Sequence, residues 1–210
     1  MAMQAYNSLG MSNKGQMRDI VETLCFSSSN ISPKVEECKS QLRNLLQTPC
    51  IFQKLNYDDG IIGIGCGILL LFNDGILDND FMPLIYELDS IAMKIVDKRL
   101  LTGTSLGNGI CGVGYYLYLR CKNLNIQDCD NLKELTIAQY IIFFIDWLSE
   151  SVKSERVCLL TAHHVFYLIE RLLHIGLLKD ELHDLKRYIY PYKRRVVLKL
   201  NRKNIDPYPR

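Results

Sequence analysis

The chain has 210 residues, of which 48% are hydrophobic and 23% charged, and its formal net charge is +2. That length can bury a core as one domain, and the balanced composition is ordinary for a globular protein. The first residues lack a basic start followed by an apolar stretch and a cleavage site, so we expect no export signal and a cytoplasmic protein. The longest apolar run, residues 61–72, has 12 residues and three glycines, too short to predict a membrane span.

Cysteines and histidines form no local metal motif. Eight cysteines are scattered along a chain rich in Leu and Ile, which favours free, mostly buried thiols over a disulfide scaffold. Neither a CxxC pair nor an HExxH motif occurs, so the sequence predicts no metal site of its own and no cofactor.

In chain order, the first predicted helix contains Ile20, Val21 and Leu24, and the second starts near Ser32. Apolar residues of the second helix recur at helical spacing, namely Val35, Cys38, Leu42, Leu45 and Leu46. We expect these two helices to form a first hairpin over about residues 11–59.

The second hairpin, about residues 60–108, begins with the GxxGxG motif Gly60-Ile-Ile-Gly63-Ile-Gly65, which opens a nearly all-apolar helix. After a polar turn, Asp80 is a plausible N-cap for an amphipathic helix. The apolar face of that helix contains Phe81, Leu84, Ile85, Leu88, Ile91, Ala92, Ile95 and Val96.

The third hairpin, about residues 109–157, repeats this layout at a spacing of 49 residues. Its motif Gly109-Ile-Cys-Gly112-Val-Gly114 again opens an apolar helix, and an amphipathic helix follows a polar stretch. The apolar face of the amphipathic helix contains Leu132, Leu135, Ala138, Ile141, Ile142, Ile145 and Leu148.

The fourth hairpin, about residues 158–206, keeps the helices but loses the glycines. Cys158, Thr161 and His163 occupy the motif positions, and residues 165–173 still predict a helix. A second, short helix follows, with Leu182, Leu185 and Ile189 as its apolar residues.

These units predict an all-α protein, an α/α toroid-like array of about four helical hairpins, equivalent to a partial α/α barrel. The first helix of each unit is apolar nearly all round and the second is amphipathic, which predicts an inner and an outer layer. We expect residues 1–185 to form this single repeat domain. Residues 186–210 form a tail with nine basic and one acidic side chain, so its net charge is +8 and that of the rest is −6.

The glycine motifs have two explanations. Bare backbone lets neighbouring helix ends crowd around a shared axis, and this close packing is the favoured one. Amide groups at helix N-termini also bind anions, so the end where the motifs gather is the natural place for a binding site. The residues expected to line a pocket there are Gly60, Gly63, Gly65, Asn108, Gly109, Gly112 and Gly114.

Two segments, Asp59 to Phe72 and Ser105 to Tyr115, resemble the repeat of lanthionine synthetase C-like proteins. The resemblance extends over about residues 55–150 and implies an α/α toroid whose glycine motifs start the inner helices around a central pocket. Family enzymes bind one zinc ion there. They add a cysteine thiolate to a dehydrated serine or threonine of a peptide, which makes a thioether ring.

The zinc ligands of that family are not matched in this chain. In active cyclases a cysteine stands two positions before one glycine motif, and a Cys-His pair directly precedes the next. The corresponding positions here hold Asp58, Gly107 with Asn108, and Arg156 with Val157. Without the metal nothing evident lowers the thiol pKa, so we expect no cyclase activity from this chain alone, and zinc only with ligands from elsewhere.

Candidate catalytic residues are His163, His164, Asp58 and Asp59. Adjacent residues on a helix point about 100° apart, so only one of the two histidines can face a pocket. A pocket-lining histidine without catalytic duty is the favoured interpretation, and the two aspartates favour an N-cap. Helical-toroid glycosidases, however, use two carboxylates across the sugar.

Two classes of function remain. One is a non-catalytic or accessory protein that binds a peptide substrate or a peptide-modifying enzyme. The other is an enzyme, either a cyclase completed by a partner's metal ligands or a hydrolase using Asp58, Asp59 and His163. The family toroid closes with about seven hairpins, so four of them predict a partner chain, self-association or polar end repeats. The basic and aromatic run from Tyr188 to Arg195 resembles nucleic-acid surfaces, but a solvated terminus is the favoured explanation.

Overall fold

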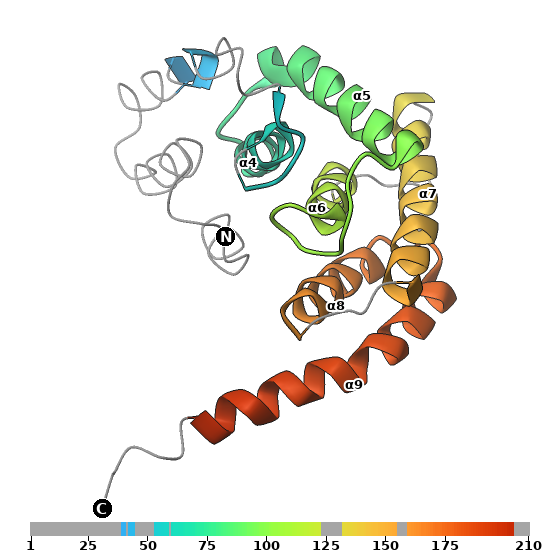
Figure 1. Ribbon diagram of the computed structural model, residues 1–210. Coiled ribbons are helices and arrows are strands. Elements are labelled where there is room, and N and C mark those ends of the chain that lie inside the picture. Colours follow the sequence, from blue (N-terminus) through green and yellow to red (C-terminus); the bar gives the residue numbers. More distant parts are fainter. Residues whose placement is uncertain are drawn as a thin grey trace, which may run out of the picture.

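The structure is a computed structural model that describes residues 39–40, 42–44, 53–58, 60–122, 132–154 and 159–203. Secondary structure within these residues is helical, without a strand, which confirms the predicted all-α class (Figure 1). The helix predicted around Ile20 lies outside the described residues. Only Lys39–Ser40 and Leu42–Asn44 represent the second predicted helix, and Leu42 is fully buried.

The helices follow the predicted order. They are α4 (Ile61–Asn73), the 3-10 turn η2 (Asn79–Phe81), α5 (Met82–Lys98), α6 (Ile110–Cys121), α7 (Leu132–Ser154), α8 (Leu159–Leu173) and α9 (Lys179–Lys203). The entry into α5 differs in one detail from the prediction: the side chain of Asp78, not that of Asp80, accepts a backbone hydrogen bond, from the Asp80 amide. Pro83 stands in the first turn of α5, and Arg99 ends the helix in the left-handed conformation.

The helices form two curved rows (Figure 1). α4, α6 and α8 pack on one another in sequence as the inner row, while α5 and α7 pack beside them and α9 packs on α8. The inner helices α4 and α6 are buried almost all round, from Ile61 to Leu71 and from Ile110 to Leu119. These two helices lack a polar face because neighbouring helices cover them on most sides.

The loops before α4 and α6 share a hydrogen bond and an N-cap conformation 49 residues apart. The amide of Ile61 donates to the carbonyl of Lys54 at 2.9 Å, and that of Ile110 donates to the carbonyl of Gly103 at 3.0 Å. Both N-cap glycines are extended, with φ −122° and ψ −176° at Gly60 and φ −111° and ψ −170° at Gly109. The sequence repeat is therefore also a repeat of backbone geometry in these two units.

A buried polar network joins α5 to α6. The Asp89 carboxylate accepts hydrogen bonds from the Tyr116 hydroxyl at 2.8 Å and from Nε of Arg120 at 3.0 Å. The Asp89 and Arg120 side chains are only 7% and 11% exposed. Burial and the neighbouring Asp89 raise the pKa of Tyr116, so its phenol stays protonated and donates.

One described helix segment, Leu135–Ser154 of α7, is long and apolar enough to cross a membrane by length and composition. Within the fold its apolar side belongs to the core, where Ile137, Ile141 and Phe144 are buried. Its other side exposes charged residues such as Asp146 and Glu150, which is typical of an amphipathic helix covering a core.

Helix α9 is longer than the short helix predicted from Leu182, Leu185 and Ile189. It runs for 25 residues to Lys203, through Pro191 and into the segment predicted as a tail. Proline lacks the amide hydrogen that would bond one turn back, and its ring crowds the carbonyl there, so it costs the helix about 3 kcal/mol without ending it here. The residues after Pro191 are mostly Lys, Arg and Leu, which favour helix, and no glycine interrupts them.

Candidate functional site

The predicted site residues gather at one end of the inner row. We call this end the glycine pole: the loops before α4 and α6 (residues 53–60 and 99–109) and the first turns of α8 (residues 159–164). Asp59 lies outside the described residues. The amides of Tyr57 and Asp58 both donate to the Gly107 carbonyl, at 2.8 and 3.2 Å, so the two loops lie side by side.

Asparagine side chains also connect the two loops of the glycine pole. Asn56 donates from Nδ2 to Oδ1 of Asn108 at 2.6 Å. The Asn108 amide donates in turn to the Ser105 hydroxyl at 3.3 Å. Oδ1 of Asn56 is buried and has no hydrogen-bond partner in the described part of the chain. Asn108 is exposed at this end of the row.

The middle glycine of each motif lets the preceding loop fold over the helix start. A Cβ atom at Gly63 would overlap the backbone carbonyl of Tyr57. One at Gly112 would lie 2.7 Å from the carbonyl oxygen of Leu106, which is the equivalent residue 49 positions later. Gly60 and Gly109 are similarly crowded by the backbone of their own loops.

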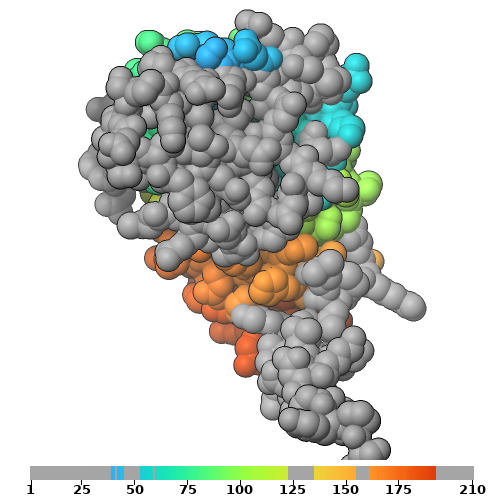
Figure 2. Space-filling model, turned by 90° about the vertical axis from the view of Figure 1, so that its left-hand side faces the viewer, coloured from blue at the N-terminus to red at the C-terminus, as the bar shows by residue number. Residues whose placement is uncertain are grey.

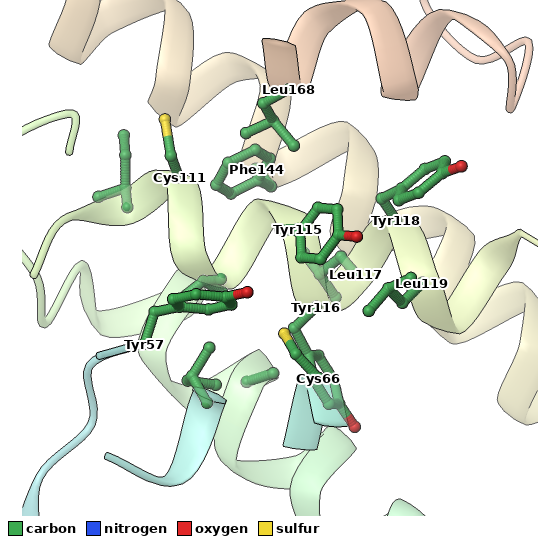
Figure 3. Packing of buried hydrophobic residues seen from close by; sticks show 14 of the residues in the cluster. Tyr57, Cys66, Cys111, Tyr115, Tyr116, Leu117, Tyr118, Leu119, Phe144 and Leu168 are labelled. Carbon is green, nitrogen blue, oxygen red and sulfur yellow. The ribbon is translucent and has the colours of Figure 1, made fainter. Parts of the chain in front are cut away.

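The third glycine of each motif lets the next inner helix approach. A Cβ atom at Gly65 would lie 2.8 Å from the Tyr116 ring of α6, and one at Gly114 would lie 2.7 Å from Leu168 of α8. Phe144 and Leu168 lie together beside α6 in Figure 3. The equivalent residue of α8 is His163, which is exposed. Close packing accounts for all six motif glycines.

The two histidines at the start of α8 differ in environment. His163 is exposed, whereas His164 is half-buried and its Nδ1 accepts a hydrogen bond from the Leu106 amide at 3.3 Å. His164 therefore connects α8 to the loop that precedes α6. Burial lowers the pKa of His164, the neighbouring His163 lowers it further, and Asp58 raises it.

These contacts limit what His164 can do chemically. An imidazole that accepts through Nδ1 is neutral and carries its proton on Nε2, so it has no lone pair left for a general base. His164 can donate a hydrogen bond through Nε2. Of the predicted catalytic residues, His163 and Asp58 expose their side chains at the pole.

The free energy of unfolding is expected to fall as the pH drops below about 6.5, the ordinary pKa of histidine. His164 has a lowered pKa in the folded state, so the unfolded chain takes up the proton first and gains stability at acid pH. Urea denaturation between pH 8 and pH 5, compared with His164→Asn, measures this contribution. Asn Oδ1 can accept from Leu106 without titrating, so the variant should lose part of the pH dependence. Substitution of the exposed His174 by asparagine is the control, and an equal effect there would contradict the assignment.

Potential metal ligands do not gather in the described part of the chain, where no group of three or more His, Cys, Asp or Glu side chains lies together. Cys66, Cys111 and Cys121 are all buried. Burial raises the pKa of the Cys66 and Cys111 thiols, which disfavours the reactive thiolate at neutral pH. Cys66 and Cys111 form no disulfide, as predicted.

Two further features of the fold were not predicted. A surface hollow of ≈ 430 Å³ lies between the C-terminal parts of α5 and α7, and charged side chains such as Asp97, Arg99 and Lys153 line it. A group of tyrosines with one arginine lies between α6 and α8. Two sequence features could have predicted this group: tyrosines three residues apart on α6, and a tyrosine and an arginine four residues apart on α8.

Comparisons of the chain with models of protein families, with curated proteins and with solved structures found no match. The function is therefore inferred from the residues and their geometry.

Proposed function

We propose that this protein is an accessory, non-catalytic component of a cytoplasmic peptide-modification system, of the lanthionine synthetase C-like type, which binds a peptide or a peptide-modifying enzyme. The observation that carries the proposal is the repeated loop and helix start at Gly60 and Gly109. In both units a GxxGxG motif begins an inner helix, and the preceding loop folds back over it with the same hydrogen bond.

The proposed architecture is a partial α/α barrel of about four hairpins. The inner row of α4, α6 and α8 and the outer row of α5, α7 and α9 support it, as does the 49-residue period. His163 replaces the glycine that admits a following inner helix, which favours a polar end repeat at α8 over another hairpin packed in the same way.

A non-catalytic role is favoured by the residue types at the glycine pole. Asp58, Gly107 and Asn108 stand where family cyclases carry cysteine and histidine ligands. The described thiols with raised pKa values are buried, and Nδ1 of His164 is engaged with the Leu106 amide. The alternative is an enzyme that uses the exposed Asp58 and His163 as a hydrolase, or one that takes zinc ligands from a partner.

Peptide binding without ring formation is the expected result for the purified chain. The probe is a fluorescent synthetic peptide with one cysteine and one dehydroalanine, and fluorescence anisotropy measures its binding. Ring formation leaves the peptide mass unchanged because it is an addition, so the loss of a thiol that iodoacetamide can alkylate is the measure of cyclisation. We also expect zinc, measured by elemental analysis, far below the one ion per chain that a catalytic site holds.

Each alternative predicts a different outcome. Thioether formation with stoichiometric zinc would support the cyclase. Peptide or glycoside hydrolysis that is lost in Asp58→Asn would support the hydrolase. Absence of peptide binding would contradict a peptide-binding role for this chain.

A further inference from the structure

Three tyrosines and an arginine converge between α6 and α8. We call Tyr115 and Tyr118 of α6 with Tyr167 and Arg171 of α8 the Tyr-Arg cluster. The ring of Tyr115 lies 5.8 Å from that of Tyr118 and 6.5 Å from that of Tyr167. In Figure 3 the hydroxyls of Tyr115 and Tyr118 point toward the same side of α6, and Tyr116 points away from them.

Arg171 supplies the positive charge of the cluster. Its guanidinium lies 4.9 Å from the centre of the Tyr167 ring, and its Nη2 donates to the Tyr167 hydroxyl at 2.9 Å. Burial opposes the charge of Arg171, but Tyr167 and, to a smaller extent, Tyr118 raise its pKa. In the part of the chain that the structure describes, no carboxylate forms an ion pair with this guanidinium.

Tyr115 provides a second observation that points to a missing ligand. The residue is 2% exposed, yet its hydroxyl makes no hydrogen bond to any described residue. Burial raises its pKa, so the hydroxyl stays protonated and remains a donor, and Arg171 is close enough to affect that pKa. A ligand oxygen at this place would supply the acceptor that no described residue gives the Tyr115 hydroxyl.

The donors of the cluster suit a carboxylate. A guanidinium presents its N–H groups in a planar fork that matches two carboxylate oxygens, and the Tyr115 hydroxyl can donate to one of them. The cluster contains one cation, and the nearby C-terminal ends of α6 and α8 add partial negative charge. A singly charged carboxylate is therefore better balanced than a phosphate dianion. α8 reaches the surface on the side of the inner row, seen in Figure 2.

We propose that the Tyr-Arg cluster binds a carboxylate of the peptide, either an acidic side chain or the C-terminal carboxylate. The identity of the ligand as a peptide rests on the proposed function, whereas the carboxylate chemistry rests on the cluster alone. The competing explanation is structural: Arg171 stands in the last turn of α8, where a cation offsets the helix dipole.

The test uses the full chain labelled with ¹⁵N and follows the Nε–H resonance of Arg171, assigned by its loss in Arg171→Lys. The probes are N-acetylglutamate amide for a side chain, N-acetylglycine for a C-terminus, and N-acetylglutamine amide as the neutral isostere. We expect the two carboxylates to shift the resonance and the isostere to leave it in place. The carboxylate with the tighter binding identifies the source.

Variants separate ligand binding from structure. Arg171→Gln and Arg171→Lys should each weaken carboxylate binding about tenfold or more, because lysine keeps the charge but lacks the planar fork. Binding to these variants is measured by calorimetry. Tyr115→Phe should weaken binding about fivefold and leave the melting temperature of the unliganded protein unchanged, because no described residue pairs with the hydroxyl that is removed. Arg187→Gln and Tyr140→Phe are matched controls, each with its hydrogen bond on another surface.

Two results would overturn the proposal. One is a resonance that does not respond to carboxylate, either because the neutral isostere shifts it as strongly as the carboxylates do or because none of the probes shifts it. The other is full carboxylate binding in Arg171→Lys together with lost stability in Tyr115→Phe, which is the structural outcome. If the labelled peptide binds Arg171→Gln normally, only this inference fails. If the small carboxylates bind and the peptide does not, the cluster stands and the proposed function fails.

Discussion

Replacement of Gly63 by alanine is expected to lower the free energy of unfolding by at least about 3 kcal/mol. The new Cβ would overlap the carbonyl of Tyr57, which is backbone and can move only if the loop before α4 lifts from the helix. Alanine is by itself the better helix former by about 1 kcal/mol, so any net loss must come from this overlap. Urea denaturation followed by circular dichroism measures the change.

Gly75→Ala is the control for the Gly63 substitution. Gly75 has φ +72°, and no atom lies within 4 Å of the position that a Cβ would take there, so the cost of alanine is conformational, about 1 kcal/mol. Gly112→Ala should behave as Gly63→Ala does, because the Leu106 carbonyl and Tyr57 crowd it in the same way. Equal stability of Gly63→Ala and the wild type would contradict the packing explanation of the motif.

Substitution of Asp89 by asparagine is expected to destabilise the fold by about 3–5 kcal/mol, the cost of breaking a buried ion pair from one side. The change leaves the guanidinium of Arg120, which is 11% exposed, without a charged partner. The Tyr116 hydroxyl keeps a long contact to the Ile85 carbonyl at 3.4 Å and loses its charged acceptor. Denaturation curves at low and high salt measure the effect, and burial should make it insensitive to salt.

A double substitution and an exposed pair complete this test. Asp89→Leu with Arg120→Met removes both charges together and should recover much of the lost stability, since no unpaired buried charge remains. Glu150→Gln breaks the ion pair between Arg99 and Glu150, whose side chains are 52% and 61% exposed, and should change stability little. A similar loss in Glu150→Gln and Asp89→Asn would show that burial does not set the strength of the network.

Polar contacts between helices were the main part of the fold that could not be predicted. Asp89 stands in the apolar stripe of α5, four residues after Ile85 and three before Ala92, and Arg120 is the one charged residue of α6. Each was visible as an exception to an apolar pattern. Their partnership depends on the packing of α5 against α6, which no local spacing encodes.

The candidate site, too, could be predicted from the sequence only in part. The sequence predicted that the glycine motifs gather at one end of the inner helices and that two adjacent histidines differ in environment. It could not assign Nδ1 of His164 to the Leu106 amide, because the two residues are 58 positions apart. The Tyr-Arg cluster was missed because tyrosines in an apolar helix look like core residues until a second helix brings a guanidinium beside them.

The length of α9 could not be predicted from the local sequence either. The sequence predicted a short helix and, from residue 186 on, a basic tail, yet α9 continues to Lys203. A proline inside a helix costs about 3 kcal/mol. Burial of Leu182, Leu185 and Ile189 on the core, at about 1.5–3 kcal/mol per side chain, offsets this cost and holds the first half of the helix in place.

Apolar periodicity and the 49-residue repeat determined by themselves that the described part of the chain is helical, which helices are buried all round, and where glycine is needed. Those properties follow from backbone geometry and from the need to bury apolar faces, and both act over a few residues at a time. Only the tertiary structure decided which loop carbonyl covers each glycine, which buried charge meets which partner, and which tyrosine hydroxyl has no acceptor among the described residues. These pairings depend on how separate helices pack, at distances along the chain that no local pattern records.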